Sequence, residues 1–391
     1  MSLNDTPGAE RIQIGFFGLR NAGKSSLVNR ITNQEVSLVS EVKGTTTDPV
    51  RKSMEILPLG PVTLIDTPGF DDEGILGEQR VRRTGEVLAV CDVAILVTEN
   101  STLNETEKEL CKLIENRDIP YLIVRSKADL GSGNASEQMI TVSSEDGTGI
   151  EELKEQIGQL MKGREKQLRF VADLIRPGDT VILVIPIDSS APKGRLILPQ
   201  QEAIRDILDA GAVSVVTGVE ELPKTIDSLK EPPALVITDS QAFGRVMKLV
   251  PEEIPLTSFS ILMARYKGFL TQAVEGAAAL DSLPEHGRIL ISEGCTHHRQ
   301  CEDIGTVKLP NWIRKYTGRT PEFIFTSGHG FPENLSGIHM VIHCGACMLN
   351  DREVQNRMLR AAEAGVPFTN YGTVIAKMNG ILERSIRPVG L

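Results

Sequence analysis

The sequence lacks any long apolar run. No uninterrupted stretch reaches the roughly eighteen residues that a membrane-spanning helix needs. The first residues, MSLNDTPGAERIQIGFFG, also lack the charged segment and apolar run that mark a secretory signal. We therefore expect a cytoplasmic protein that does not partner with a membrane.

The sequence also has fewer basic than acidic residues. The 391 residues include 42 Lys and Arg against 52 Asp and Glu, for a formal net charge of -10. Nucleic-acid-binding proteins normally present a basic surface to phosphates, so this balance argues against a nucleic-acid partner.

Cysteines are few, with six in the chain. In a cytosolic protein of this size, such cysteines bind metals, carry redox chemistry or lie buried, and they seldom form a disulfide framework. Cys91 and Cys111 stand beside apolar positions, so we expect both to be packing residues. The other four lie near the end of the chain.

Apolar runs of strand length alternate with helical stretches in three successive segments. This alternation predicts an α/β protein of three domains, each with a parallel sheet, at residues 1–168, 169–265 and 266–391. The expected strands lie within 12–18, 62–69, 92–98, 120–126 and 139–144, then 180–187, 212–217, 234–239 and 255–259, then 288–294, 322–328, 339–345 and 367–372.

A phosphate-binding loop follows the first expected strand. The segment GLRNAGKS, residues 18–25, is a complete G-x-x-x-x-G-K-S pattern with a helical stretch behind it. Its backbone N–H groups can surround phosphates, Lys24 can neutralise them, and Ser25 can bind Mg²⁺. The residues expected at the nucleotide here are Gly18, Asn21, Ala22, Gly23, Lys24, Ser25 and Ser26.

Further short motifs follow in the order that a GTPase requires. GTTTD (44–48) offers switch threonines, and DTPG (66–69) offers Asp66 to the metal's surroundings and the Gly69 N–H to the γ-phosphate. In SKAD (126–129), Asp129 can accept from the guanine edge while the Lys127 stem covers the base. The base-edge loop SSE (143–145) completes the series. The nucleotide-base residues predicted are Ser126, Lys127, Asp129, Ser143 and Ser144.

This first segment resembles the TrmE/Era branch of GTPases in NAGKSSLVN, GTTTDP, DTPGFDD and VSSEDGTGIEEL. The resemblance implies that Thr46 binds Mg²⁺, and that Asn21 marks a K⁺-activated enzyme. Lys24, Thr46, Asp66 and Gly69 would then serve catalysis. Phe70 replaces the usual water-orienting glutamine, so we expect slow turnover of GTP to GDP.

Two positions depart from that branch. Thr47 stands where relatives often carry Arg, and Ser126 stands where Asn is usual. Because Ser is shorter and offers fewer hydrogen bonds to the phosphate loop, we expect weaker nucleotide affinity with unchanged base identity.

The last segment places Cys and His residues after its expected strands. Cys295, His297 and His298 follow the first, His329 the second, and His343, Cys344 and Cys347 the third. Loops that leave the carboxyl ends of parallel strands meet at one edge. The residues alone leave four interpretations open: a Cys344–Cys347 dithiol, a Cys₃His zinc site, a three-thiolate [4Fe–4S] site, or inert buried cysteines.

The pattern C-x-H, then H-C-x-x-C, resembles the [FeFe]-hydrogenase maturation GTPases, and the resemblance spans the whole chain. It implies that Cys295, Cys344 and Cys347 bind a [4Fe–4S] cluster. For its fourth ligand the candidates are His343, His297, a carboxylate such as Asp188, or an external group. Cys301 is read as a non-ligand.

The same resemblance implies a homodimeric scaffold that accepts a diiron precursor from radical-SAM maturases and delivers it to apo-[FeFe]-hydrogenase. Two alternatives remain at this stage. One is a TrmE/Era-type GTPase that acts on RNA or the ribosome and carries a zinc domain, although the acidic composition opposes it. The other is a dithiol oxidoreductase fused to a GTPase.

Overall fold

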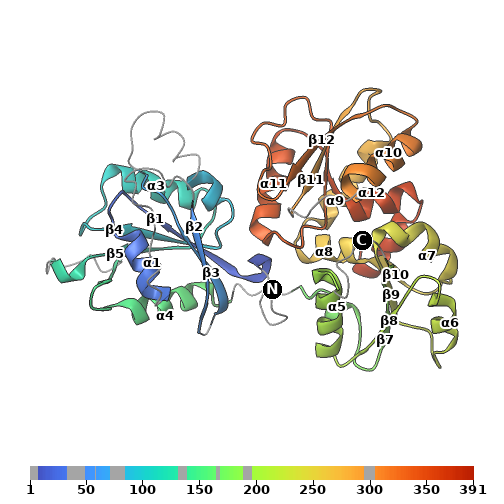
Figure 1. The fold of residues 1–391 in the computed structure, drawn as a ribbon, viewed down its shortest axis with the longest axis horizontal. Coiled ribbons are helices and arrows are strands. Elements are labelled where there is room, and N and C mark those ends of the chain that lie inside the picture. Colours follow the sequence, from blue (N-terminus) through green and yellow to red (C-terminus); the bar gives the residue numbers. More distant parts are fainter. Residues whose placement is uncertain are drawn as a thin grey trace. The chain divides into compact units, whose positions relative to one another are not determined.

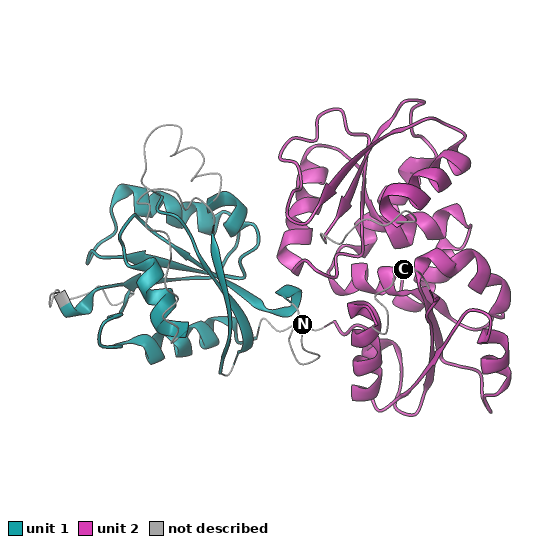
Figure 2. Ribbon diagram, in the orientation of Figure 1, with its two compact units in different colours: residues 1–165 teal, residues 166–391 magenta. Residues whose placement is uncertain are grey.

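The computed structural model describes residues 8–32, 49–57, 59–70, 84–130, 139–163, 168–187, 196–294 and 304–391. These belong to two compact units, residues 1–165 and 166–391, which Figure 2 shows in teal and magenta. The first unit contains one sheet and the second contains two (Figure 1). The boundaries predicted at 168 and 265 stay predictions.

The sheet of the first unit has six strands in the order β2-β3-β1-β4-β5-β6. All neighbouring pairs are parallel except β2 with β3. The central strand β4 is buried at every residue, as expected for a strand with helices on both faces. The strands are β1 (Ile12–Phe17), β2 (Val50–Ile56), β3 (Gly60–Asp66), β4 (Val93–Thr98), β5 (Tyr121–Arg125) and β6 (Met139–Thr141).

Strand β2 was not predicted, and it adds an antiparallel edge to the predicted strands, which pair in parallel. Its sequence VRKSMEI carries charged side chains and is mostly exposed, so it lacks the apolar run that revealed the other strands. It pairs antiparallel with β3 along its whole length. An edge strand with charged side chains is a common way to keep a sheet from pairing with other chains.

Helices cover both faces of this sheet. They are α1 (Lys24–Thr32), α3 (Glu105–Glu115) and α4 (Ile150–Met161). Apolar side chains of α1 and α4 pack on one face, and those of α3 pack on the other. Cys91 and Cys111 lie in the second of these clusters, so their predicted packing role is confirmed.

The two sheets of the second unit are entirely parallel. Their orders are β10-β9-β7-β8 and β12-β11-β13-β14. Every strand predicted in residues 180–372 is present: β7 (Thr180–Val184), β8 (Val213–Thr217), β9 (Leu235–Thr238) and β10 (Leu256–Ser258), then β11 (Arg288–Glu293), β12 (Glu322–Ser327), β13 (Met340–His343) and β14 (Phe368–Asn370). The predicted α/β fold class is therefore confirmed.

Three helices of this unit begin at a side-chain cap, in which Ser258, Asn350 or Asn370 accepts a backbone N–H bond. The helices are α5 (Leu198–Asp209), α6 (Leu222–Asp227), α7 (Phe243–Leu249), α8 (Phe259–Tyr266), α9 (Leu270–Ala277), α10 (Leu309–Thr317), α11 (Asp351–Glu363), α12 (Tyr371–Met378) and α13 (Leu382–Ile386).

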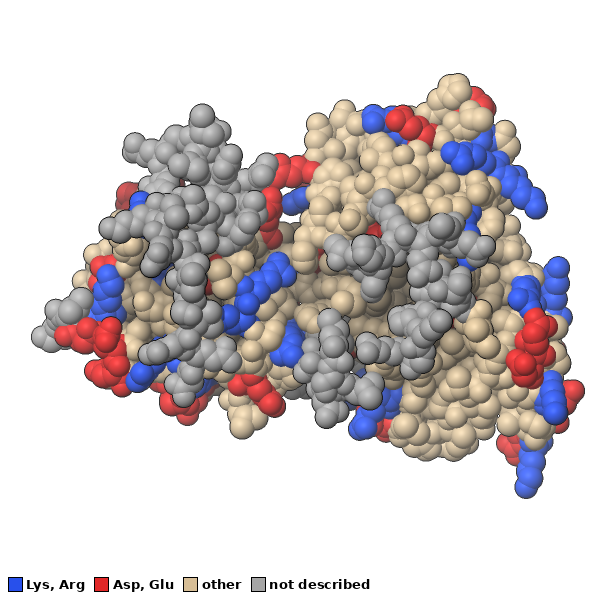
Figure 3. All heavy atoms as spheres, in the orientation of Figure 1, with Lys and Arg blue, Asp and Glu red and all other residues tan. Residues whose placement is uncertain are grey.

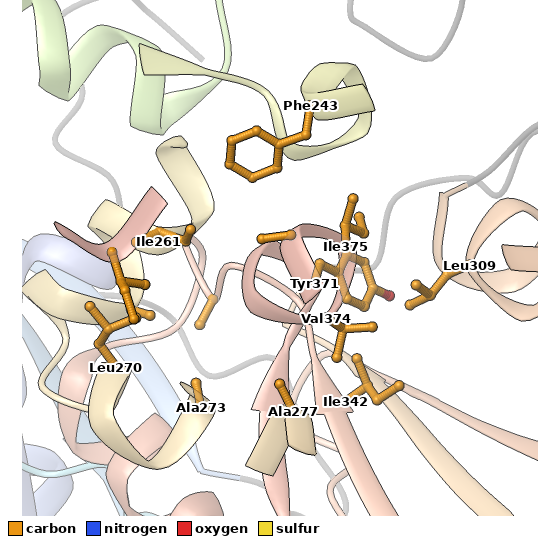
Figure 4. Packing of buried hydrophobic residues seen from close by; sticks show 14 of the residues in the cluster. Phe243, Ile261, Leu270, Ala273, Ala277, Leu309, Ile342, Tyr371, Val374 and Ile375 are labelled. Atoms are coloured by element: carbon orange, nitrogen blue, oxygen red, sulfur yellow. The ribbon is translucent and has the colours of Figure 1, made fainter. Parts of the chain in front are cut away.

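One hydrophobic cluster joins the two sheets of the second unit. It contains Val236 from the middle sheet and Ile342 from the last sheet. Figure 4 shows Phe243 of α7, Ile261 of α8 and Ile375 of α12 among the side chains between them. Shared burial of this kind makes the two sheets one compact unit, because separating them would expose these side chains to water.

No described helix has the length and apolar character needed to cross a bilayer. On the face shown in Figure 3, basic and acidic side chains are interspersed over the described residues of each unit. The expectation that nucleic acid is not a partner stays a prediction.

Candidate functional site

The phosphate loop takes a strained backbone path that its glycines permit. Gly18 has a φ of +144°, and a Cβ there would lie 2.2 Å from the Val97 carbonyl oxygen. Gly23 has a φ of +88°. Asn21 also has a positive φ, 61°, which Asn tolerates better than most residues. Any residue with a Cβ at Gly18 would therefore collide with the backbone of β4.

Lys24 lies buried at the start of α1, at 6% exposure. Its ammonium donates to the carbonyl oxygens of Leu19 at 2.7 Å and Gly18 at 3.1 Å. These bonds hold the Lys24 ammonium over the loop, where the G-x-x-x-x-G-K-S pattern predicts that it contacts the phosphates.

Asp66 and Ser25 form the predicted magnesium corner. The Ser25 hydroxyl donates to Asp66 Oδ2 at 2.5 Å, while the buried Asp66 Oδ1 has no hydrogen-bond partner within the described residues. Burial raises the pKa of Asp66, although the Ser25 bond and the charges of Lys24 and Lys52 oppose that rise. An unpaired buried carboxylate oxygen beside a serine hydroxyl fits the oxygen ligands that Mg²⁺ prefers.

A cavity of about 480 Å³ opens at this corner. Loop residues, the DTPG motif and the stem of Lys127 surround it. Its walls are Arg20, Asn21, Gly23, Lys24, Ser25, Ser26, Val50, Asp66, Thr67, Pro68, Gly69 and Lys127. Of the residues predicted for the nucleotide and its metal, the structure thus brings eight to one space, from Asn21 to Lys127 along the chain.

The residues predicted for the base lie at the ends of β5 and β6. The Ser126 hydroxyl donates to the Ala22 carbonyl at 2.7 Å, so this serine keeps one bond to the phosphate loop. Ser143 donates to Asp129 Oδ1 at 2.8 Å, which orients that carboxylate. Lys127 has a φ of 58° and pairs with Glu99. Ser144, half-buried, follows Ser143 in the same loop.

Phe70 packs against the apolar cluster that contains α3, and its backbone N–H donates to the Gly18 carbonyl at 3.3 Å. An apolar ring in this place cannot orient a water molecule by hydrogen bonding. The predicted Mg²⁺ ligand Thr46 and its neighbour Thr47 lie outside the described residues.

A second group of predicted residues lies at the carboxyl edge of the last sheet. Cys344 follows β13, and its sulfur accepts N–H bonds from Gly294 at 3.0 Å and Ala346 at 3.3 Å. Burial raises the pKa of the Cys344 thiol, and those two N–H groups oppose the rise. Ala346 has a φ of 59°, an uncommon conformation that turns the backbone tightly around the sulfur.

His343 is fully buried in β13. Its Nδ1 lies 3.0 Å from the Cys344 carbonyl oxygen, and its Nε2 lies 3.0 Å from Nη1 of Arg357. Burial, followed by the charge of Arg357, lowers the pKa of His343 to about 3. Both ring nitrogens are therefore engaged by protein atoms in this arrangement.

The other predicted cluster residues fall in different places. Cys347 is half-buried and packs beside the apolar cluster of the middle sheet. His329 lies at the surface and bonds to Glu353. The described part of the chain contains no group of three His, Cys, Asp or Glu that could hold a metal ion. The predicted ligands Cys295 and His297, the candidate Asp188 and the non-ligand Cys301 lie outside it.

Sequence reasoning missed the charged residues beneath the Cys344 turn. Arg357 and Glu353, both on α11, are at most 6% exposed. They share a helical face with the buried Val354 and Ala361. No local pattern in the sequence marks this burial, because an arginine or a glutamate on a helix usually faces solvent.

Two family models match the second half of the chain. The hydrogen maturase F dimerization domain matches residues 170–268, and the hydrogen maturase F tetramerization domain matches residues 271–388. Together they span more than half of the chain. The chain belongs to the hydrogen maturase F family. A third model, 50S ribosome-binding GTPase, matches residues 13–127, so this family member carries a GTPase domain, whose fold binds GTP or GDP with Mg²⁺.

Curated relatives match the GTPase domain. A tRNA modification GTPase MnmE of Nitrosomonas europaea is 35% identical over 153 residues, which are 37% of this chain and 34% of the relative. The MnmE of Aquifex aeolicus is 32% identical over 154 residues, covering 38% and 34%. The chain thus spans about a third of the length of these relatives.

Two solved structures are similar to parts of this chain. Era of Aquifex aeolicus bound to GDP and aluminium fluoride has 18% identity and a TM-score of 0.35, covering 53% of this chain and 92% of Era. The G domain of T. maritima FeoB has 21% identity and a TM-score of 0.32, covering 39% and 100%. At these TM-scores neither likeness bears on the function of this chain.

Proposed function

We propose that the protein is a GTPase scaffold that holds a [4Fe–4S] cluster through Cys295, Cys344 and Cys347. In this proposal it receives a diiron precursor as cargo from radical-SAM maturases and delivers that cargo to apo-[FeFe]-hydrogenase. The family membership and the phosphate-loop cavity support the hydrogenase-maturation and GTPase parts. The cluster part depends on the edge of the last sheet.

The single observation that carries the cluster proposal is the Gly294 N–H that donates to Cys344 Sγ at 3.0 Å. Gly294 directly precedes Cys295 in the sequence. Because consecutive Cα atoms lie about 3.8 Å apart, the chain passes the Cys344 sulfur one residue before it supplies another cysteine. Cys347 follows on the same turn as Cys344.

The donors at this edge fit an iron–sulfur cluster. Such clusters are held by cysteine thiolates, and backbone N–H groups that donate to the sulfur adjust their reduction potential. Cys344 already accepts two such bonds. When bound, a cluster with three protein thiolates offers one iron for an external ligand, which suits a scaffold that must accept and release cargo.

An anaerobic preparation tests the proposal. The full chain should be brown and, once reduced, should show the EPR signal of a [4Fe–4S] cluster. Cys344→Ser should lose that signal, while the buried packing variant Cys111→Ser should keep it. Colourless protein with bound zinc would contradict the proposal and support an RNA- or ribosome-associated GTPase, and a metal-free Cys344–Cys347 disulfide would support an oxidoreductase.

We further propose that K⁺ activates slow GTP hydrolysis through Asn21, which has a positive φ and lines the phosphate cavity. Turnover should be faster in K⁺ than in Na⁺, and Asn21→Ala should lose that preference. Equal wild-type rates in the two salts would remove Asn21 from the mechanism. Phe70 should keep turnover slow in either salt, because it offers no hydrogen bond to water.

The homodimer is proposed to form through β8, which is an edge strand of the middle sheet. Val213 and Val216 on this strand are 51% and 50% exposed, and Leu208 of α5 is 57% exposed. Exposed apolar side chains on an edge strand favour pairing with another chain. Light scattering should find a dimer, and Val216→Lys should dissociate it. Leu57 is also an exposed apolar residue but lies outside β8, so the control variant Leu57→Lys should remain dimeric.

A further inference from the structure

A buried guanidinium joins the ends of three strands at the cysteine edge. Arg357 of α11 is 3% exposed. Its Nη1 donates to Ser292 Oγ of β11 at 3.3 Å and to His343 Nε2 of β13 at 3.0 Å, and its Nη2 donates to the Gly328 carbonyl, just past β12, at 2.6 Å. These are the neighbouring strands β12, β11 and β13, from two of which the predicted cluster cysteines follow.

The bond from Arg357 determines the protonation of His343. A guanidinium has only N–H donors, so Nε2 of His343 must accept with its lone pair. The single ring proton then lies on Nδ1, where it donates to the Cys344 carbonyl oxygen at 3.0 Å. His343 is thus held as one neutral tautomer, and its Nδ1–H bond restrains the backbone of Cys344, the proposed cluster ligand.

Arg357 is itself held in place from the other side. Its Nη2 also pairs with Glu353, one helical turn earlier, and Glu353 bonds to His329 Nδ1 at 2.9 Å. The guanidinium lies over the Phe331 ring, 5.4 Å from its centroid. With bonds on both sides and a ring beneath it, the guanidinium has little freedom to change its orientation.

We propose that Arg357 is a positioning residue for the cluster: it holds the Nδ1–H tautomer of His343, which orients Cys344 and does not itself bind iron. This inference rests on the proposed cluster function, but its first step concerns the protein alone. The partners named above connect the backbone of three strand ends to one side chain, so loss of that side chain loosens the turn at Cys344.

Nitrogen NMR of the cluster-free full chain tests the first step. With ¹⁵N-histidine labelling, the His343 signals are identified by their loss in His343→Gln. We expect a protonated Nδ1 and an unprotonated Nε2 in the wild type, and a loss of this single tautomer in Arg357→Met. Arg357→Lys should restore it, because an ammonium still donates to Nε2. A wild-type proton on Nε2, or an unchanged Arg357→Met spectrum, would overturn the proposal.

Iron release tests the second step. After anaerobic reconstitution, Arg357→Met should lose iron to a chelator about tenfold to a hundredfold faster than the wild type, because substitutions of residues that orient metal ligands commonly weaken metal binding by such factors. Arg360→Gln, on the same helix, should release iron at the wild-type rate. His343→Gln should retain the cluster, because its amide can still accept from Arg357 and donate to Cys344. Equal release from Arg357→Met and wild type, or loss of the cluster in His343→Gln, would contradict the role.

Two further comparisons separate the possible failures. Arg357→Met leaves Glu353 buried without its cation, so the double variant with Glu353→Gln removes that charge and should fold like the wild type. It should still lose the tautomer, and a retained tautomer would overturn the proposal. If wild-type protein binds no cluster at all, the proposed function fails. The NMR result still decides whether Arg357 determines the tautomer of His343.

Discussion

The phosphate edge of the first sheet and the cysteine edge of the last sheet are built in different ways. At the first, a continuous loop of eight residues contains the phosphate-binding motif, and Asp66 bonds to its last residue, Ser25. At the second, Cys344 depends on Gly294, which is 50 positions away in the chain, and on Arg357 of the next helix.

The difference explains why one short motif describes most of the first site, whereas the cysteine motif leaves out the residues that support the second. A phosphate loop uses its own backbone N–H groups, so a short pattern of glycines describes it. A site gathered from three strand ends needs side chains that hold those ends together, and here Arg357 does so. Substitutions at the two edges should therefore fail differently, with lost ligand binding at the first and loosened geometry at the second.

The largest effect is expected at the phosphate edge. Lys24→Ala removes the buried positive charge that neutralises the phosphates, so the rate of GTP hydrolysis should fall about a hundredfold to a thousandfold. The exposed Lys108→Ala, which breaks a surface pair with Glu105, should leave the rate unchanged. Steady-state phosphate release measures both, and a Lys24→Ala rate within twofold of wild type would refute the assigned role.

At the cysteine edge, Glu353→Gln should lower the free energy of unfolding by about 3 kcal/mol at pH 7, because Arg357 loses a buried partner. Burial alone would raise the pKa of Glu353. The bond from His329 and the charge of Arg357 outweigh that effect, so the pKa lies below its usual 4.5. The carboxylate therefore stabilises the fold above pH 4.5, and this contribution is lost as the pH falls through the lowered pKa.

Urea unfolding from pH 7 down to pH 3.5 measures that dependence. The wild type should lose stability over this range more steeply than Glu353→Gln. The exposed carboxylate Glu363, on the same helix, supplies the control, and Glu363→Gln should follow the wild-type curve. Identical slopes for all three proteins would show that the buried pair contributes nothing.

A smaller effect is expected at Ser126, which bonds the phosphate loop from β5. Ser126→Ala removes one hydrogen bond of about 1 kcal/mol to the Ala22 carbonyl, so the Kd for GDP should rise about fivefold. The preference for guanine should remain, because Asp129 is unchanged. Calorimetry with GDP and ADP measures both quantities, and an unchanged Kd for GDP would show that Ser126 does not support the loop.

The smallest effect concerns Asp66 in the nucleotide-free protein. Burial raises its folded pKa, so its ionisation costs stability as the pH rises from 3.8 through the raised value. Asp66→Asn should therefore melt slightly higher than wild type at pH 7 and gain less from added Mg²⁺ and GDP. The exposed control Asp146→Asn should respond to Mg²⁺ as the wild type does. A full Mg²⁺ response in Asp66→Asn would contradict the metal corner.

Apolar runs in the sequence were enough to predict the buried parallel strands, because helices cover both faces of those strands. Strand β2 escaped prediction because it lies at an edge and its charged residues face water. The phosphate-loop residues were predicted for a similar reason, since their contacts are local in sequence.

The network around Arg357 could not be predicted from local sequence. An arginine on a helix usually faces solvent, and only the packing of α11 against three strand ends buries this one. His343 was predicted as a candidate metal ligand from its motif. The bond that occupies its Nε2 comes from a residue fourteen positions later, and no pattern within HCGAC reveals it.

The central claim is that cysteines from two distant turns hold one cluster at the edge of the last sheet. Its most direct test compares the iron content and EPR signal of Cys295→Ser and Cys301→Ser after anaerobic reconstitution. We predict that Cys295→Ser loses the [4Fe–4S] signal and Cys301→Ser keeps it. A full [4Fe–4S] signal in Cys295→Ser would contradict the account.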